Sequence, residues 1–342
     1  MPPVDSTTEQ ADDPVHELIT SPIPKVLWHY TDLEGFRGIV NSRQIHATNI
    51  RYLNDKEEFE HGFKRAKDLL LEMLPPEEAD PPMVRTLVAG TFERIFSAGA
   101  LCPANLSLFT ASFTLNGDQL SQWRGYSRGS AGVSLGFDFA GMRKFTAPKT
   151  PVTFAPCVYQ DEDKARLLRH SMTSFVNPVL KLAMDTADIP TVRRALDELQ
   201  KARPDLSPGQ VSDVYFEGVE NRRHKELPQT IAELSSRLLH LVALLKHSAF
   251  EEEEEWRLVL PVFAIMPNRP DLRFRSRSST LVPYTEFPLT GGETVNAFRL
   301  KEVVLGPGSE DPLAVTSARS FLDSVGLKDV RISRSRIPYR PW

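Results

Sequence analysis

Five consecutive glutamates, residues 251–255, directly precede an apolar segment, 256–262, that has the composition of a buried strand. Side chains alternate between the two faces of a strand, so Glu253, Glu255 and Arg257 are expected on one face. A carboxylate fixed at a strand end can stabilise positive charge that develops on a bound group during a reaction. We predict Glu255 as the catalytic carboxylate, with Glu253 as its alternative. The competing interpretation is that Glu255 forms an ion pair with Arg257 or another nearby basic residue.

His29 and Thr31 form a second polar pair, at the end of a segment, Val26–Tyr30, that reads as a strand. The period of two places both side chains on one face, where each can hydrogen-bond a sugar hydroxyl. The alternative is a core histidine with an internal partner and a threonine that caps the helix expected from Leu33.

The segment Gln122-Trp123-Arg124-Gly125-Tyr126 is dense in hydrogen-bond donors and aromatic rings. The Arg124 guanidinium can clamp a phosphate, Gln122 can hold a sugar or an amide, and Trp123 can pack as a wall. A salt bridge within the fold is the alternative role for Arg124.

Metal chemistry has less support in the sequence. Two cysteines, Cys102 and Cys157, are too few for a cysteine zinc cage, and no two of the eight histidines lie four residues apart. We therefore predict no metal site. The acidic group of Asp55, Glu57 and Glu58 keeps one alternative open, a nuclease or nucleotide hydrolase that uses a divalent metal.

Several function classes are excluded by missing motifs and by charge. The chain has no GxGxxG, GxxxxGK[ST], HExxH or GxSxG motif, so a Rossmann dehydrogenase and a P-loop nucleotide hydrolase are not expected. Its 27 prolines outnumber its 18 glycines, which also disfavours glycine-rich phosphate loops. Its 41 basic and 45 acidic residues give a net charge of -4, which excludes a generally basic nucleic-acid coat. A local basic patch is still compatible with this charge. Arg273, Arg275 and Arg277 alternate along an expected edge strand and are the best candidates for contact with nucleic acid or another anionic partner. The alternative is that they form an ordinary solvated strand face.

The order of the expected elements indicates one α+β domain with a helical insertion. Residues 1–24 are polar and rich in proline, and we expect a mobile leader there. Residues from about 161 to 249 are almost wholly helical in pattern, and strand-rich segments flank them on both sides. Strands are expected at 26–30, 44–47, 106–114, 132–137, 152–159, 256–262, 273–275, 298–305 and 330–333, and helices outside the insertion at 33–40, 57–74, 82–98 and 312–325.

The expected location is the cytoplasm. The 342 residues contain no run of about 18 apolar residues, and the acidic start lacks the basic and apolar regions of a signal peptide. We therefore expect no membrane partner.

Taken in order, these motifs resemble a bacterial family catalogued as domain of unknown function 2971, from about Val26 to the C-terminus. More distantly, His29 and Thr31, followed by a short helix with Gly38-Ile39-Val40, resemble the first nucleotide-binding segment of the ADP-ribosyltransferase superfamily. The motifs that carry the family resemblance are His29-Tyr30-Thr31, Arg51–Asp55 with Glu58-Phe59, Ser112-Phe113-Thr114, Gln122–Tyr126, Gly132–Phe137, Phe250 with Glu255-Trp256-Arg257, Val304–Pro307 and Ser335–Arg340.

The superfamily resemblance implies a fold and a set of roles. It implies a core of two antiparallel sheets with flanking helices over residues 25–342, and NAD as the substrate. In this resemblance His29 holds a ribose 2′-hydroxyl, and Thr31 supports it. Tyr52 is the first candidate, and Tyr126 the second, for the ring that stacks on nicotinamide. Ser112 shapes the floor of the pocket. A tyrosine packed at a strand edge is the alternative for either ring.

The activity implied by the resemblance is mono-ADP-ribosylation of a nucleic acid or a protein, with toxin or antiviral defence biology as its setting. Tyr30 stands where the poly(ADP-ribose) polymerases carry glycine, so polymer synthesis is not expected. The rival from another class is a non-catalytic nucleotide-sensing or protein-interaction module that keeps the pocket without turnover.

Overall fold

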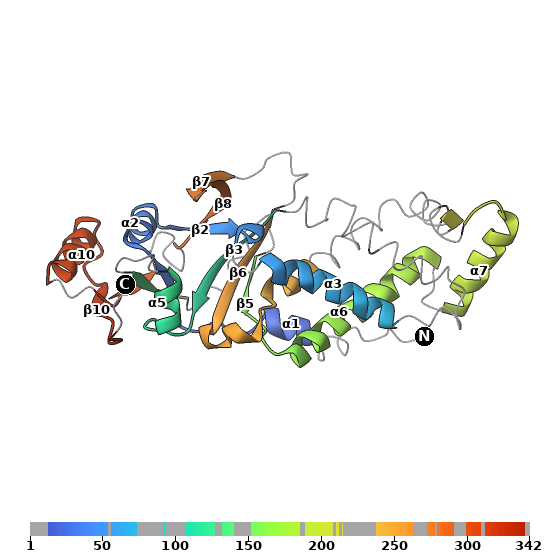
Figure 1. Ribbon diagram of the computed structural model, residues 1–342, viewed down its shortest axis with the longest axis horizontal. Helices are drawn as coiled ribbons and strands as arrows, with labels where there is room; N and C mark the ends of the chain where they lie inside the picture. The colour runs from blue at the N-terminus through green and yellow to red at the C-terminus, as the bar shows by residue number, and fades with distance from the viewer. Residues whose placement is uncertain are drawn as a thin grey trace, which may run out of the picture.

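The computed structural model describes residues 13–53, 56–73, 92, 107–126, 132–139, 152–184, 189–207, 210, 211, 214, 237–262, 272–277, 279–290, 299–308 and 312–338. They form a mixed α/β fold in which ten strands build one open, mostly antiparallel sheet with helices on both of its faces (Figure 1). Among the helices that these residues form, none is both long and apolar enough to cross a membrane.

The strands are β1 Val26–Thr31, β2 Gln44–Asn49, β3 Ser107–Thr114, β4 Val133–Asp138, β5 Thr153–Pro156, β6 Glu255–Val262, β7 Arg273–Arg277, β8 Thr280–Pro288, β9 Leu300–Leu305 and β10 Arg331–Arg334. The helices are α1 Pro14–Ile19, α2 Leu33–Ser42, α3 Lys56–Met73, α5 Leu120–Tyr126, α6 Asp161–Met184, α7 Ile189–Ala202 and α10 Pro312–Ser324, with 3-10 turns η2 Ile50–Tyr52 and η4 Ser248–Glu253. Residues 237–244 are also helical.

The sheet forks at β3. On one side β3 pairs along its whole length with β6, which in turn pairs with β5. On the other side its end at Thr114 pairs with β1, while Phe109 and Thr110 pair with β2. One arm then continues through β4, β9 and β10, and the other through β8 and β7. The expected mixture of helices and mostly antiparallel strands is confirmed, but the two expected sheets are one, because both arms share β3.

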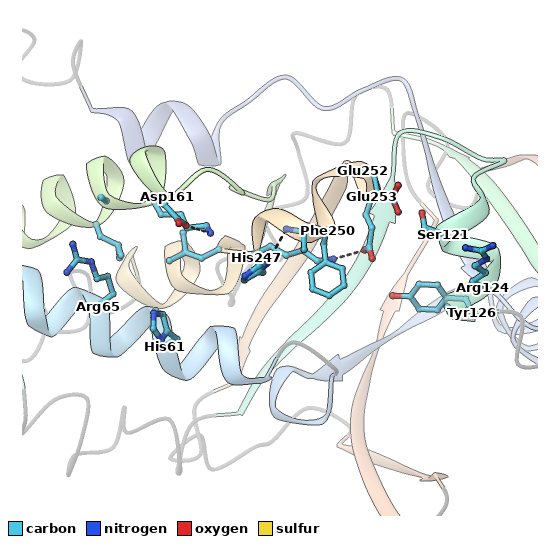
Figure 2. Close-up of a pocket in the computed structure, with 18 residues that line it drawn as sticks. His61, Arg65, Ser121, Arg124, Tyr126, Asp161, His247, Phe250, Glu252 and Glu253 are labelled. Carbon is cyan, nitrogen blue, oxygen red and sulfur yellow. Dashed lines mark hydrogen bonds and ion pairs between the residues drawn. The ribbon is translucent and has the colours of Figure 1, made fainter.

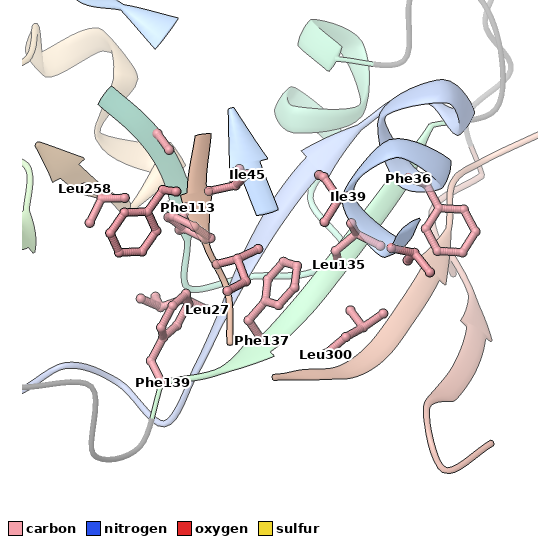
Figure 3. Close-up of a cluster of buried hydrophobic side chains, with 14 of the residues drawn as sticks. Leu27, Phe36, Ile39, Ile45, Phe113, Leu135, Phe137, Phe139, Leu258 and Leu300 are labelled. Atoms are coloured by element: carbon pink, nitrogen blue, oxygen red, sulfur yellow. The ribbon is translucent and has the colours of Figure 1, made fainter. Parts of the chain in front are cut away.

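Alternation along β3 and β6 separates two apolar cores on opposite faces. Phe113, Trp256 and Leu258 belong to the core that α2 and α10 cover, and edge-to-face rings at centroid distances of about 5 to 6 Å fill its centre (Figure 3). Leu108 and Val259 belong to the opposite core, which α1, α3, α6 and residues 237–245 cover. The polar ends of β3 and β6 lie beside this second core.

Most expected elements are present within two or three residues of their expected bounds. The chain leaves the sheet at the end of β5, passes through the helical segment and re-enters the same sheet as β6, which pairs directly with β5. The helix expected at 82–98 lies outside the described residues except for Phe92.

Three elements differ from the expectations. Residues 14–19 of the expected leader form α1, whose Val15 is fully buried in the helical core. The strand β8 was not expected, because Pro283 interrupts its pattern; its partners β2 and β7 lie on either side. The short helix α5 was not among the expected elements, and its Trp123 packs edge-on against Tyr30 of β1.

Asp118 anchors the C-terminal segment to α5. Its Oδ1 accepts hydrogen bonds from Trp123 Nε1 at 2.8 Å and Ser335 Oγ at 2.5 Å, and its Oδ2 accepts one from the Arg336 backbone at 2.8 Å. This bridge orients α5, which contributes to the site described below.

Gly117 and Gly136 leave space for the indole of Trp28, which gives a first prediction. A Cβ at Gly117 would lie 2.3 Å from the Trp28 ring, whereas a Cβ at Gly38 meets nothing within 4 Å. We expect Gly117→Ala to lower the free energy of unfolding by about 1–3 kcal/mol. In the matched control, Gly38→Ala in helix α2, stability should be unchanged or slightly higher. Urea denaturation measures both, and equal stabilities of the two variants would contradict the packing described here.

Candidate functional site

A cleft of about 1350 Å³ lies on the face of the sheet that α1, α3, α6 and residues 237–245 cover. At one end it is lined by α3 and α6, and at the other by α5 and η4 (Figure 2). The lining residues are His61, Gly62, Arg65, Ser121, Arg124, Gly125, Tyr126, Asp161, Lys164, Ala165, Leu168, Leu245, Lys246, His247, Ala249, Phe250, Glu252 and Glu253.

The turn η4, which carries three of the glutamates, is fixed in place by its neighbours. His247 caps its start by accepting a hydrogen bond from the Ala249 backbone at 3.1 Å. Thr114, the last residue of β3, donates to the carbonyl of Glu253 at 2.6 Å, and Gln119 donates to the carbonyl of Glu252. Glu254 ends the turn in the left-handed conformation. These bonds hold η4 against the end of β3, and its residues Glu252 and Glu253 form the rim of the cleft on this side.

A buried chain of alternating charges connects this rim to the sheet. Lys246, with a side chain only 3% exposed, donates from Nζ to Glu253 Oε2 at 2.6 Å and to Glu255 Oε2 at 2.5 Å. Arg257 donates to both oxygens of Glu255, from Nε at 2.9 Å and from Nη2 at 3.0 Å. Two carboxylates and two cations thus compensate one another, and of the four side chains only Glu253 is partly exposed.

Glu255 occupies the centre of this chain. Burial opposes its ionisation, but the charges of Arg257 and then Lys246 outweigh burial and lower the pKa of Glu255 to about 2. Both of its oxygens are engaged by cations, and Glu255 does not belong to the cleft lining. The ion pair with Arg257 that was the competing interpretation for Glu255 is observed, so each oxygen of Glu255 has a structural partner.

Glu253, the alternative to Glu255 in the sequence analysis, lines the cleft. Its side chain is 18% exposed, and Lys246 holds Oε2. Oε1 makes no hydrogen bond to the described residues. Glu253 thus combines a carboxylate that Lys246 fixes at one oxygen with a place in the lining of the cleft.

Helix α5 brings two further predicted residues to the cleft. Arg124 and Tyr126 are exposed and line it, and in Figure 2 the Tyr126 hydroxyl points toward the side that carries Phe250 and Glu253. Gln122, on the same helix, is 6% exposed and does not line the cleft. The predicted binding segment therefore contributes Arg124 and Tyr126 to the cleft, while Gln122 is buried beside it.

His29 and Thr31 lie on the other face of the sheet. Trp28 pairs with Thr114, and Thr114 pairs with Glu255, so these three side chains share a face. His29 follows Trp28 and projects oppositely, and its ring contacts Phe113 at 5.7 Å between centroids. The structure does not bring the His-x-Thr pair to the glutamates.

The surroundings of His29 match the alternative set out for it, a core histidine with an internal partner. His29 Nδ1 lies 2.9 Å from the carbonyl oxygen of Ser112, in the fork between β1 and β2. Burial, with the nearby charge of Arg275, lowers the pKa of His29 and favours a neutral ring. The cap of α2 is Asp32 and not Thr31, because the Asp32 side chain accepts a hydrogen bond from the Gly35 backbone at 2.8 Å.

The remaining sequence candidates are dispersed. Tyr52 ends η2, is 38% exposed and lies outside the cleft lining, as does Ser112 on β3. Arg275 donates to Thr48 at 2.8 Å, and Arg273 pairs with Glu286 at 3.0 Å, so this expected patch is bonded across strands. The side chains of Glu57, Glu58 and Arg277, and all of Asp55, lie outside the described residues. Among the described residues, no group of three or more His, Cys, Asp and Glu could hold a metal ion.

Sequence reasoning missed Lys246, Phe250 and the α3–α6 end of the cleft. The sequence does contain a signal for Lys246, which directly follows a buried segment, 238–245, that is apolar except for His240. A buried lysine needs a carboxylate partner, and the glutamate run begins five residues later. Its ammonium also lies 5.2 Å from the centroid of the Phe250 ring.

The comparisons with known proteins agree with part of the expected resemblance. Residues 122–258 match the model of a family described as Protein of unknown function (DUF2971), a segment that runs from α5 to β6. No curated protein and no solved structure matches the chain. The matched segment thus spans the helix that supplies Arg124 and Tyr126, the glutamate rim and the buried charge chain.

The buried chain predicts a large stability effect. Replacing Glu255 with Leu leaves Arg257 and Lys246 without their shared buried carboxylate, which should lower the free energy of unfolding by about 3–5 kcal/mol. Glu254→Gln, on an exposed neighbour, should change it by less than about 0.5 kcal/mol. Chemical denaturation measures both variants. A loss below about 1 kcal/mol in Glu255→Leu would show that the charge chain does not support the fold.

The same group predicts a pH dependence. The pKa of Glu255 is lower in the folded chain than its ordinary value of 4.5, so the folded state favours the ionised form. This contribution to stability is complete above about pH 4.5 and is lost as the pH falls toward 2. The stability advantage of the native chain over Glu255→Gln should therefore shrink across that range in denaturation curves recorded at each pH. An advantage that is constant with pH would contradict the lowered pKa.

Proposed function

We propose that this chain is an NAD-consuming mono-ADP-ribosyltransferase that works in the cleft between α5 and η4, with Glu253 as its carboxylate. The observation that carries the proposal is the position of Glu253. It lies at a cleft that also presents two exposed rings, Phe250 and Tyr126, and its Oε2 is fixed by a lysine that is itself buried. The acceptor is a nucleic acid or a protein.

The reaction needs a fixed negative charge at one place. The bond between C1′ of the nicotinamide ribose and the ring nitrogen breaks, and its electron pair leaves with neutral nicotinamide. Positive charge then develops on the ribose, as in glycoside hydrolysis, and a carboxylate within contact stabilises it. An acceptor oxygen or nitrogen attacks C1′ and releases its proton to the solvent.

The two rings and Arg124 suit the rest of this substrate. An exposed tyrosine or phenylalanine offers a flat face on which nicotinamide can stack, and Tyr126 and Phe250 are 45% and 41% exposed. Arg124, one turn from Ser121 on the same helix, adds a cation at this end of the cleft. Tyr126 and Arg124 are also residues that the sequence predicted for these roles.

Neutralising Glu253 tests the proposal. Glu253→Gln keeps the size of the side chain and removes its charge, so the release of nicotinamide from labelled NAD should fall about 100-fold or more. Glu254→Gln, an exposed neighbour outside the cleft lining, should keep native activity.

Three other outcomes would redirect the assignment. No nicotinamide release and no NAD-dependent thermal shift by the native chain would exclude NAD as its substrate. A thermal shift without release would favour a nucleotide sensor. Cleavage of nucleic acid that a chelator abolishes would favour the metal-dependent alternative.

A further inference from the structure

The α3–α6 end of the cleft is not used by the proposed chemistry at Glu253. Figure 2 shows His61 and Arg65 on α3 at the opposite end of the cleft from Arg124 and Tyr126. The cleft volume of about 1350 Å³ exceeds the roughly 300–1,000 Å³ of common small-molecule pockets. A group that reacts at Glu253 therefore leaves room at the α3–α6 end for another part of the ligand.

Basic groups line this end from two helices. His61 and Arg65 are four residues apart, so they share one face of α3, and Lys164 faces the same space from α6. The lining there carries two permanent cations, Arg65 and Lys164, against one carboxylate, Asp161. Asp161 is 92% exposed in its side chain and pairs with Lys164 at 2.9 Å.

Arg65 can exchange its present partner for a ligand. It donates to Glu72 at 3.3 Å, and both side chains are about half exposed, so this pair contributes little. Glu72 also lies 3.8 Å from Arg169 of α6. If Arg65 turns into the cleft, Glu72 keeps a cation beside it, and the cost of the exchange is small.

We infer that the α3–α6 end of the cleft is a phosphate-binding subsite in which Arg65, with Lys164 and His61, holds a phosphate of the ligand. Arginine binds two phosphate oxygens at once with its planar fork, and Lys164 adds a point charge. The phosphate belongs either to the diphosphate of NAD, which rests on the proposed function, or to a phosphodiester acceptor.

Titration calorimetry with three probes tests this subsite. NAD carries a diphosphate, nicotinamide riboside carries no phosphate, and a ten-residue oligothymidylate carries only phosphodiesters. Arg65→Ala should weaken the binding of a phosphate-bearing probe by about tenfold or more and leave nicotinamide riboside unaffected. The matched control is Lys64→Ala, which removes an exposed charge outside the cleft lining and should change no affinity.

The pattern of losses identifies the source of the phosphate. A loss confined to NAD assigns the subsite to the diphosphate, and a loss confined to the oligonucleotide assigns it to an acceptor. If the native chain does not bind NAD and Arg65→Ala still weakens the oligonucleotide, the subsite is supported while the proposed function fails. Unchanged binding of both phosphate-bearing probes, or equal losses in Arg65→Ala and Lys64→Ala, would overturn the inference.

Discussion

The ammonium of Lys246 lies between the carboxylates of Glu253 and Glu255, and the arrangement of the site depends on this contact. Lys246 follows the last buried helix before η4, whereas Glu255 begins β6. The ion pairs therefore fix the glutamate turn to the sheet at the point where the helical segment ends. Arg257 completes the charge balance and also donates to the carbonyl of Ala243 at 2.7 Å, so helix and strand are joined twice. Burial makes these bonds strong and the loss of any one partner costly.

The strand register decides which polar residues meet. Glu255 projects from the same face as Thr114 and Trp28, and this face carries the cleft. His29 is only one residue from Trp28, yet its side chain lies on the opposite face of the sheet, beside Phe113. A single step along a strand thus separates the histidine from the glutamates, and the fork at β3 gives His29 a backbone partner of its own.

The sequence was sufficient to predict an element or a contact where the interaction that determines it is local. The pattern of 256–262 predicted β6, and the alternation that places Glu255 and Arg257 on one face supplied the competing interpretation, an ion pair, which is observed. It was insufficient where contacts join distant segments. The face of His29 relative to Glu255 depends on the pairing of Trp28 with Thr114, 86 positions apart, which no local pattern encodes. Helix α5 was missed because its packing comes from Tyr30 of β1 and from Asp118, whose partners include Ser335 near the C-terminus.

The central claim is that the reacting ribose binds at Glu253, and a crystal structure of the Glu253→Gln variant with NAD tests it most directly. The account predicts the nicotinamide riboside in the cleft between α5 and η4, within hydrogen-bond distance of residue 253 and with its ring against Tyr126 or Phe250. A nucleotide bound in the fork beside His29, with the cleft at Glu253 unoccupied, would contradict the account.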